Sequence, residues 1–131
     1  MKRRINRTKP RERPRFTEPD DAPLLSGYRA MWLVAMFDLP VTSKAAKKRA
    51  ARFRKDLVSR GFHMLQWSVY ARYCASEAFA EGIKADVRSV LPSDGQVRLL
   101  GVTDRQYGKM EVFFGKKRLP TEDPPPQLML F

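Results

Sequence analysis

One carboxylate stands out as a candidate for chemistry, because it directly follows a strongly apolar stretch. In "MWLVAMFDLP", residues 31–40, seven apolar residues precede Asp38, and Leu39 and Pro40 follow it. A carboxylate at the end of a buried strand can serve as a ligand for a metal ion. It can also simply end the strand and cap a helix that begins after Pro40. The residue types leave both interpretations of Asp38 open.

Few other reactive residues lie near Asp38 in the sequence. No His, Lys or second acid close to it is an evident general base. Ser68 and Asp104 could approach from other expected strands. Cys74 and His63 are the chain's one cysteine and one histidine, too few for a cysteine-based zinc site. We interpret His63 as a polar strand residue.

A strongly basic segment follows. In "KAAKKRAARFRKDLVSR", residues 44–60, eight basic residues stand against one acid. A helix whose charges are merely solvated normally mixes Glu among its Lys and Arg. The imbalance favours contact with a phosphate backbone over a solvated charged face. Four of the candidate contacts fall on one side of the helix and two flank them: Lys44, Lys48, Arg52 and Lys55, with Lys47 and Arg54.

Aromatic residues gather in the next segment, "FHMLQWSVYARY", residues 62–73. Trp67, Tyr70 and Tyr73 could stack on bases, as aromatic residues do in RNA-recognition sheets. The Gly- and aromatic-containing octamer of those sheets is absent. Packing in the core or at an interface is therefore the favoured interpretation.

The overall charge supports a polyanionic partner. The chain has 26 Lys and Arg against 14 Asp and Glu, a formal net charge of +12. Residues 1–16 contribute +7, and the remaining 115 residues keep an excess of +5. The basic leading segment has no apolar face to insert into a membrane. Nucleic acid is thus the expected partner.

The sequence also indicates where the protein works. The longest apolar run, residues 30–37, is too short to span a bilayer. The first fifteen residues lack the apolar region of a signal peptide. A single cysteine excludes an internal disulfide and suits a reducing compartment. We expect a cytoplasmic protein that does not enter a membrane.

The elements that must position these residues follow from periodicity and turn signals. Residues 1–28 are expected to be a disordered basic arm, 29–117 one folded domain, and 118–131 a proline-rich tail with a docking segment. A strand over 31–38 precedes a helix that starts at Thr42 or Ser43 and ends at Gly61. The further expected elements are one long strand or a tight strand pair over 62–73, a helix over 76–90, a strand over 96–103, a connection over 104–108 and a last strand over 109–115.

This element order predicts a ferredoxin-like βαββαβ sandwich of the α+β class. In that fold two helices cover one face of the sheet and leave the other open. The run over residues 31–37 is apolar at positions facing both sides, so the second face should also be covered. The simplest cover is a second copy of the same sheet, which predicts a homodimer packed through the sheet faces.

Several ordered motifs resemble one known family. They are "VAMFDLP", the basic helix ending in "RGF", "LQWSVYARY" and "VTDRQYG" followed by "EVFFG". Together they resemble the small CRISPR-associated adaptation proteins, the endoribonuclease family that supplies the second subunit of the spacer-acquisition complex. The likeness covers roughly residues 29–115.

The resemblance implies a ferredoxin-like homodimer that bridges dimers of the CRISPR integrase and lies along captured duplex DNA. For some members it also implies a metal-dependent nuclease activity. There the aspartate matching Asp38 meets its symmetry mate and the two bind Mg²⁺, which makes Asp38 the candidate catalytic residue and metal ligand. Many members have Tyr before this aspartate, whereas this chain has Phe37 and lacks that hydroxyl.

The chain's last residues predict a docking segment. "QLMLF" follows the spacer "PTEDPPP", which favours an extended polyproline II conformation. The pentapeptide resembles the Gln-Leu-x-Leu-Phe motif that binds the bacterial replication sliding clamp. We hypothesise docking to the integrase or to the clamp through four residues: Gln127, Leu128, Leu130 and Phe131.

The sequence thus favours a DNA-binding adaptor of CRISPR spacer acquisition. The alternative from a different functional class is a stand-alone magnesium-dependent nuclease that cuts RNA or DNA with Asp38. An adaptor should depend on Lys48 and Arg52, and a nuclease on Asp38.

Overall fold

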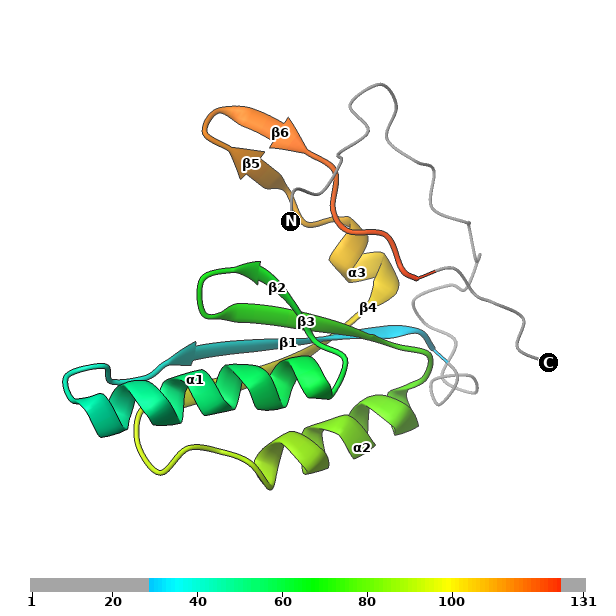
Figure 1. The fold of residues 1–131 in the computed structure, drawn as a ribbon. Coiled ribbons are helices and arrows are strands. Elements are labelled where there is room, and N and C mark those ends of the chain that lie inside the picture. Colours follow the sequence, from blue (N-terminus) through cyan, green and yellow to red (C-terminus); the bar gives the residue numbers. More distant parts are fainter. Residues whose placement is uncertain (1–28, 126–131) are drawn as a thin grey trace.

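The computed structural model describes residues 29–125, which form a four-stranded antiparallel sheet, two long helices and a smaller C-terminal part (Figure 1). The strands lie in the order β2-β3-β1-β4, so β1 is central and pairs antiparallel with both β3 and β4. Their bounds are β1 (Met31–Asp38), β2 (His63–Gln66), β3 (Val69–Cys74) and β4 (Gln96–Thr103). The expected ferredoxin-like order is therefore confirmed.

The first helix, α1 (Lys44–Ser59), starts at one of the two expected capping residues. The hydroxyl of Ser43 accepts a hydrogen bond from the Ala46 backbone N–H at 3.0 Å, which satisfies one of the free donors of the first turn. Just past its other end lies Gly61 with φ +86°, a conformation that glycine adopts at low cost. The predicted helix is confirmed at both ends.

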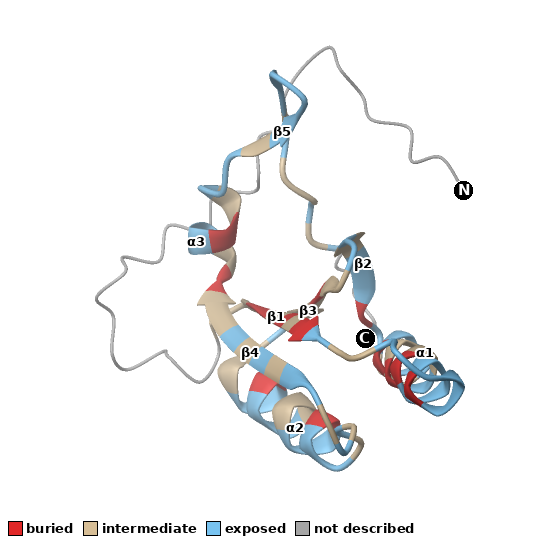
Figure 2. Ribbon diagram, turned by 90° about the vertical axis from the view of Figure 1, so that its left-hand side faces the viewer, coloured by how far each residue is buried: buried red, intermediate tan, exposed pale blue. Residues whose placement is uncertain are grey.

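Both long helices pack on one face of the sheet. Ala46, Ala50, Phe53 and Leu57 recur at helical spacing on α1 and are buried. The second helix, α2 (Glu77–Arg88), is capped by Ser76 as expected and buries Ala80 and Val87. Figure 2 shows the buried positions of both helices turned toward the sheet.

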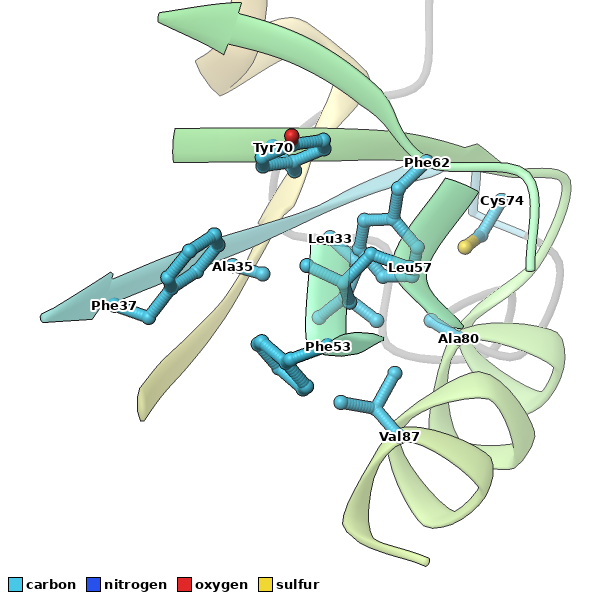
Figure 3. Packing of buried hydrophobic residues seen from close by; sticks show 10 residues of the cluster. All are labelled: Leu33, Ala35, Phe37, Phe53, Leu57, Phe62, Tyr70, Cys74, Ala80 and Val87. Atoms are coloured by element: carbon cyan, nitrogen blue, oxygen red, sulfur yellow. The ribbon is translucent and has the colours of Figure 1, made fainter. Parts of the chain in front are cut away.

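The core between helices and sheet is aliphatic and aromatic (Figure 3). From β1 it takes Leu33, Ala35 and Phe37, the alternate residues of one strand face. The Phe37 ring meets Phe53 edge-on, with ring centroids 5.2 Å apart. Burying a side chain of this size stabilises the fold by about 1.5–3 kcal/mol, so these contacts hold α1 firmly on the sheet.

The second face of the sheet has its own smaller cluster. Trp32 stacks on Tyr107 with ring centroids 4.1 Å apart, and both side chains are buried. Tyr107 belongs to a short helix, α3 (Asp104–Gly108), where we expected only a connection. That part of the prediction is wrong because Thr103 and Gln106 form a capping box, each side chain bonding the other's backbone N–H.

Within residues 29–125, this cluster covers one end of the second face. Val34 is partly buried, and its neighbour across the strands, Leu100, is 50% exposed. The subunit therefore presents an apolar surface on the face away from α1 and α2.

The last strand differs from the expectation. It is shorter, β5 (Val112–Phe114), and it does not join the main sheet but pairs with β6 (Lys117–Leu119) in a separate hairpin. The hairpin projects from the body and is mostly exposed (Figures 1 and 2). Strand β6 runs across the expected boundary between domain and tail at residue 117.

Candidate functional site

Asp38 lies at the exposed end of β1. It pairs with Gln96 of β4, and its backbone oxygen would lie 2.6 Å from a Cβ added at Gly95. The neighbouring Phe37 N–H donates to the backbone oxygen of Ser68 at 3.1 Å. Asp38 does not cap α1, because Ser43 occupies that position.

Of the two residues expected to approach Asp38, Ser68 contacts the neighbouring residue, Phe37, through its backbone oxygen, whereas Asp104 lies elsewhere. Asp104 follows Thr103, which pairs with Met31 at the opposite end of β1. Seven residues of strand, roughly 23 Å, separate the two ends. The Asp104 carboxylate instead accepts a hydrogen bond from Trp32 Nε1 at 2.7 Å. Asp104 therefore cannot share a site with Asp38 in one subunit.

The surroundings of Asp38 bear on the predicted magnesium site. Across residues 29–125 no three His, Cys, Asp or Glu side chains gather where they could hold a metal ion. Mg²⁺ is usually bound through one or two carboxylates together with several waters. A second copy of the chain would supply a second Asp38 for a two-carboxylate site.

The basic helix gives a clearer arrangement. Five of the six predicted phosphate contacts are exposed and Arg54 is half-buried. None of the six forms an ion pair with a described residue. From Lys44 to Lys55 the helix rises about 16 Å, which matches roughly five phosphates of one DNA strand.

The two edges of α1 differ in electrostatics. On the edge toward α2, Arg49 pairs with Asp94 at 3.0 Å and Arg60 pairs with Asp86 at 3.0 Å. On the other edge the guanidinium of Arg54 lies 5.1 Å from the centre of the Trp67 ring. Positive charge is thus neutralised on one edge and left available on the outer face and the opposite edge.

The aromatic residues of β2 and β3 divide in a way that sequence reasoning missed. Tyr70 is buried against Phe37, and Tyr73 packs edge-on against Trp32 with ring centroids 5.6 Å apart. Tyr70 and Tyr73 thus pack inside the subunit as expected, whereas Trp67 is 73% exposed there, so its packing at an interface stays a prediction. Its place in the turn between two predicted strands was the available signal.

Two other predictions lie outside the described residues: the basic arm over 1–28 and the docking residues Gln127, Leu128, Leu130 and Phe131. Among the helices of the described part, none is long and apolar enough to cross a membrane.

A known protein family matches the part of the chain that contains Asp38 and α1. The family model described as "CRISPR associated protein Cas2" matches residues 31–110. A curated "CRISPR-associated endoribonuclease Cas2" from Parvibaculum lavamentivorans is 52% identical over 101 residues, which cover 77% of this chain and 100% of that protein. Proteins of the same name from Flavobacterium psychrophilum and Paracidovorax avenae are 43% and 44% identical, each over 82% of this chain and over 93% and 100% of their own lengths.

A solved structure titled "Crystal structure of cas2" matches with a TM-score of 0.41 and 19% sequence identity. The match covers 55% of this chain and 74% of that one.

Proposed function

The chain belongs to the CRISPR-associated protein Cas2 family, and from that membership we propose that it is a DNA-binding adaptor of CRISPR spacer acquisition. It binds duplex DNA as a homodimer and bridges subunits of the CRISPR integrase. The observation that carries this proposal is the outer face of α1 with the edge at Arg54, where six cations form no ion pair with any carboxylate of residues 29–125.

Phosphate contacts from α1 suit an adaptor because they carry no sequence information. A protein that handles DNA fragments of many sequences needs affinity without base recognition. Lysine and arginine on a rigid helix supply this affinity by releasing counterions from the DNA.

Homodimer formation is supported by the second face of the sheet. Val34 and Leu100 form part of an apolar surface there that residues 29–125 leave partly exposed, and burying such a surface favours association. Among residues 29–125, strand β4 is also the last strand of its sheet, and an edge strand can pair with a strand of another chain. A second copy would cover both features.

For the integrase contact, we propose the C-terminal docking segment, with the replication clamp as the other candidate partner. A peptide carrying residues 118–131 should bind purified integrase in a titration. Binding to the clamp alone would reassign the segment. Changing Phe131 to Ala in the peptide is the control, since a specific anchor should not tolerate this loss.

A second candidate function is metal-dependent cleavage of RNA or DNA. It is favoured by the exposed position of Asp38 at the strand end and by the names of the relatives, which call those proteins endoribonucleases. In a dimer, Asp38 of each copy would hold a shared Mg²⁺, which would polarise the phosphodiester when bound. The carboxylates would position the ion between the subunits.

The deciding experiment compares Lys48→Gln/Arg52→Gln with Asp38→Asn. We expect the double variant to bind duplex DNA more weakly at moderate salt. The slope of log affinity against log salt concentration should also become shallower by about 2 per subunit, because two phosphate contacts are lost. Asp38→Asn should leave both properties and spacer integration with purified integrase unchanged. Equal DNA binding by the double variant and the wild type would overturn the adaptor proposal.

The nuclease function is tested in parallel on labelled RNA and DNA. Cleavage that requires Mg²⁺ and disappears in Asp38→Asn would establish it. Cleavage that persists in Asp38→Asn would exclude Asp38 as its ligand.

A further inference from the structure

Trp67 is an exposed aromatic side chain held in a fixed position. It lies in the turn between β2 and β3, at the end of the sheet where β1 also ends (Figure 1). The next residue, Ser68, has φ +63°, and its backbone oxygen accepts the hydrogen bond from the Phe37 N–H at 3.1 Å. A central strand therefore anchors the turn that presents the indole ring.

Exposure of this ring leaves a large apolar surface in water. At 73%, Trp67 is far more exposed than Trp32, the chain's other tryptophan, at 4%. Isolated exposed aromatic residues are common, but a tryptophan beside a nucleic-acid-binding surface has a specific use. Base–aromatic stacking is tolerant of sequence because every base has a flat face.

The charges around Trp67 point to an anionic ligand. Arg54 lies over its ring at 5.1 Å, a cation–π distance. Arg54 belongs to the edge of α1 that forms no ion pair with another described residue. The acidic partners of α1 lie on the opposite edge, at Asp86 and Asp94. A strand that follows the cations of α1 toward Arg54 thus arrives at the indole.

We propose that Trp67 stacks on an unpaired nucleobase at the end of the duplex held by α1, with Arg54 contacting the adjacent phosphate. Bases inside a duplex are stacked on their neighbours and offer no free face, whereas an unpaired base does. The inference rests on the proposed DNA-binding function and adds a preference for duplexes with single-stranded ends.

The test uses three duplexes of the same double-stranded length: one blunt, one with unpaired overhangs, and one whose overhangs are abasic. The abasic overhang keeps the phosphates and removes the bases. Wild type should bind the overhang duplex more tightly than the other two. Trp67→Ala should bind it roughly 5- to 100-fold more weakly and lose the preference, whereas Trp67→Phe should keep most of it.

Two controls separate this inference from the proposed function. Trp67→Ala should retain the salt dependence of blunt-duplex binding, which Lys48→Gln/Arg52→Gln reduces. If wild type binds DNA through α1 and Trp67→Ala changes nothing, the inference fails and the adaptor proposal stands. Failure of wild type to bind any duplex would remove both.

Oligomeric state provides the remaining check. Light scattering of Trp67→Ala should give the same mass as wild type. A change to a smaller species would make Trp67 an interface residue and overturn the stacking role, as would equal weakening on the overhang and abasic duplexes.

Discussion

At the residue scale, the end of β1 depends on a close approach that only glycine permits. Gly95 has φ +85°, and a Cβ there would lie 2.6 Å from the backbone oxygen of Asp38 and 2.8 Å from a methyl carbon of Leu39. Asp38 owes its fixed position at the strand end partly to this contact. The sequence indicates a turn at "SDG", but the proximity of Gly95 to Asp38 follows from the pairing of β1 with β4.

We expect Gly95→Ala to lower the free energy of unfolding by about 2 kcal/mol or more. A positive φ costs an L-residue roughly 1–2 kcal/mol, and the added methyl group also forces the backbone of Asp38 to shift. Urea denaturation followed by circular dichroism measures the change. Gly82→Ala is the matched control: an added Cβ in α2 meets nothing within 4 Å, and the change should stabilise by about 0.5–1 kcal/mol. Equal stability of the two variants would contradict the argument.

The thiol of Cys74 gives a second residue-scale prediction. Burial raises the pKa of the Cys74 thiol, and the nearby Arg72 guanidinium offsets only part of the effect. Below the ordinary thiol pKa the group is protonated in both folded and unfolded chains, so its contribution to stability is fully present. Above it, the unfolded chain loses the proton first and stability falls as pH rises.

Urea denaturation on either side of the ordinary thiol pKa should show this decline in wild type and less of it in Cys74→Ala. Alkylation of Cys74 should also be at least about tenfold slower in the folded protein than in urea, because the thiolate is the reacting form. Identical pH trends in wild type and Cys74→Ala would exclude the thiol as the cause.

At the element scale, α1 combines a buried stripe with a charged outer face. Leu57 is fully buried, whereas its neighbour Val58 is 58% exposed. Leu57→Ala should lower the free energy of unfolding by about 2–5 kcal/mol, because it removes packing and leaves a cavity. Val58→Ala should change it by less than about 0.5 kcal/mol. Thermal denaturation of the pair tests whether α1 is held by its apolar stripe, and similar losses would show that it is not.

How far the elements follow from sequence depends on the length of their signals. Helix α1 was predictable at both ends, because Ser43 and Gly61 frame a clear apolar period. Helix α3 has five residues, too few for any period, and only the Thr103–Gln106 spacing indicated it. The hairpin turns at Gly115 with φ +64°. Its second strand, β6, was not predicted because its residues are mostly basic.

The candidate site was predictable to a similar degree. The exposed cations of α1 followed from helical spacing and the lack of acids. The ion pair of Arg49 with Asp94 joins residues 45 positions apart, and the approach of Arg54 to Trp67 likewise depends on how α1 packs across the sheet. Contacts of this kind require the tertiary fold, so sequence reasoning could neither pair Arg49 with Asp94 nor place Trp67 beside Arg54.

At the scale of the whole molecule, the open face of the sheet should determine the oligomeric state. Strand β1 is buried at Leu33, Ala35 and Phe37 by the helices, while Val34 on its other face shares an apolar surface with Leu100. A dimer that buries this surface would also bring two copies of Asp38 into one assembly and double the cations available to one duplex. Dimerisation would thus serve both proposed functions.

Leu100→Lys should convert the proposed dimer to a monomer without unfolding it. Leu100 is 50% exposed in the subunit, so a lysine there remains solvated in the monomer, but a dimer would bury the new charge at high cost. Leu91→Lys is the matched control, because Leu91 is 45% exposed outside the strands of the sheet. Light scattering should give half the mass for Leu100→Lys only, with unchanged circular dichroism.

DNA affinity should fall in the same variant, since a duplex then meets one basic helix instead of two. A monomeric wild type, or a dimeric Leu100→Lys, would show that another surface joins the subunits or that none does.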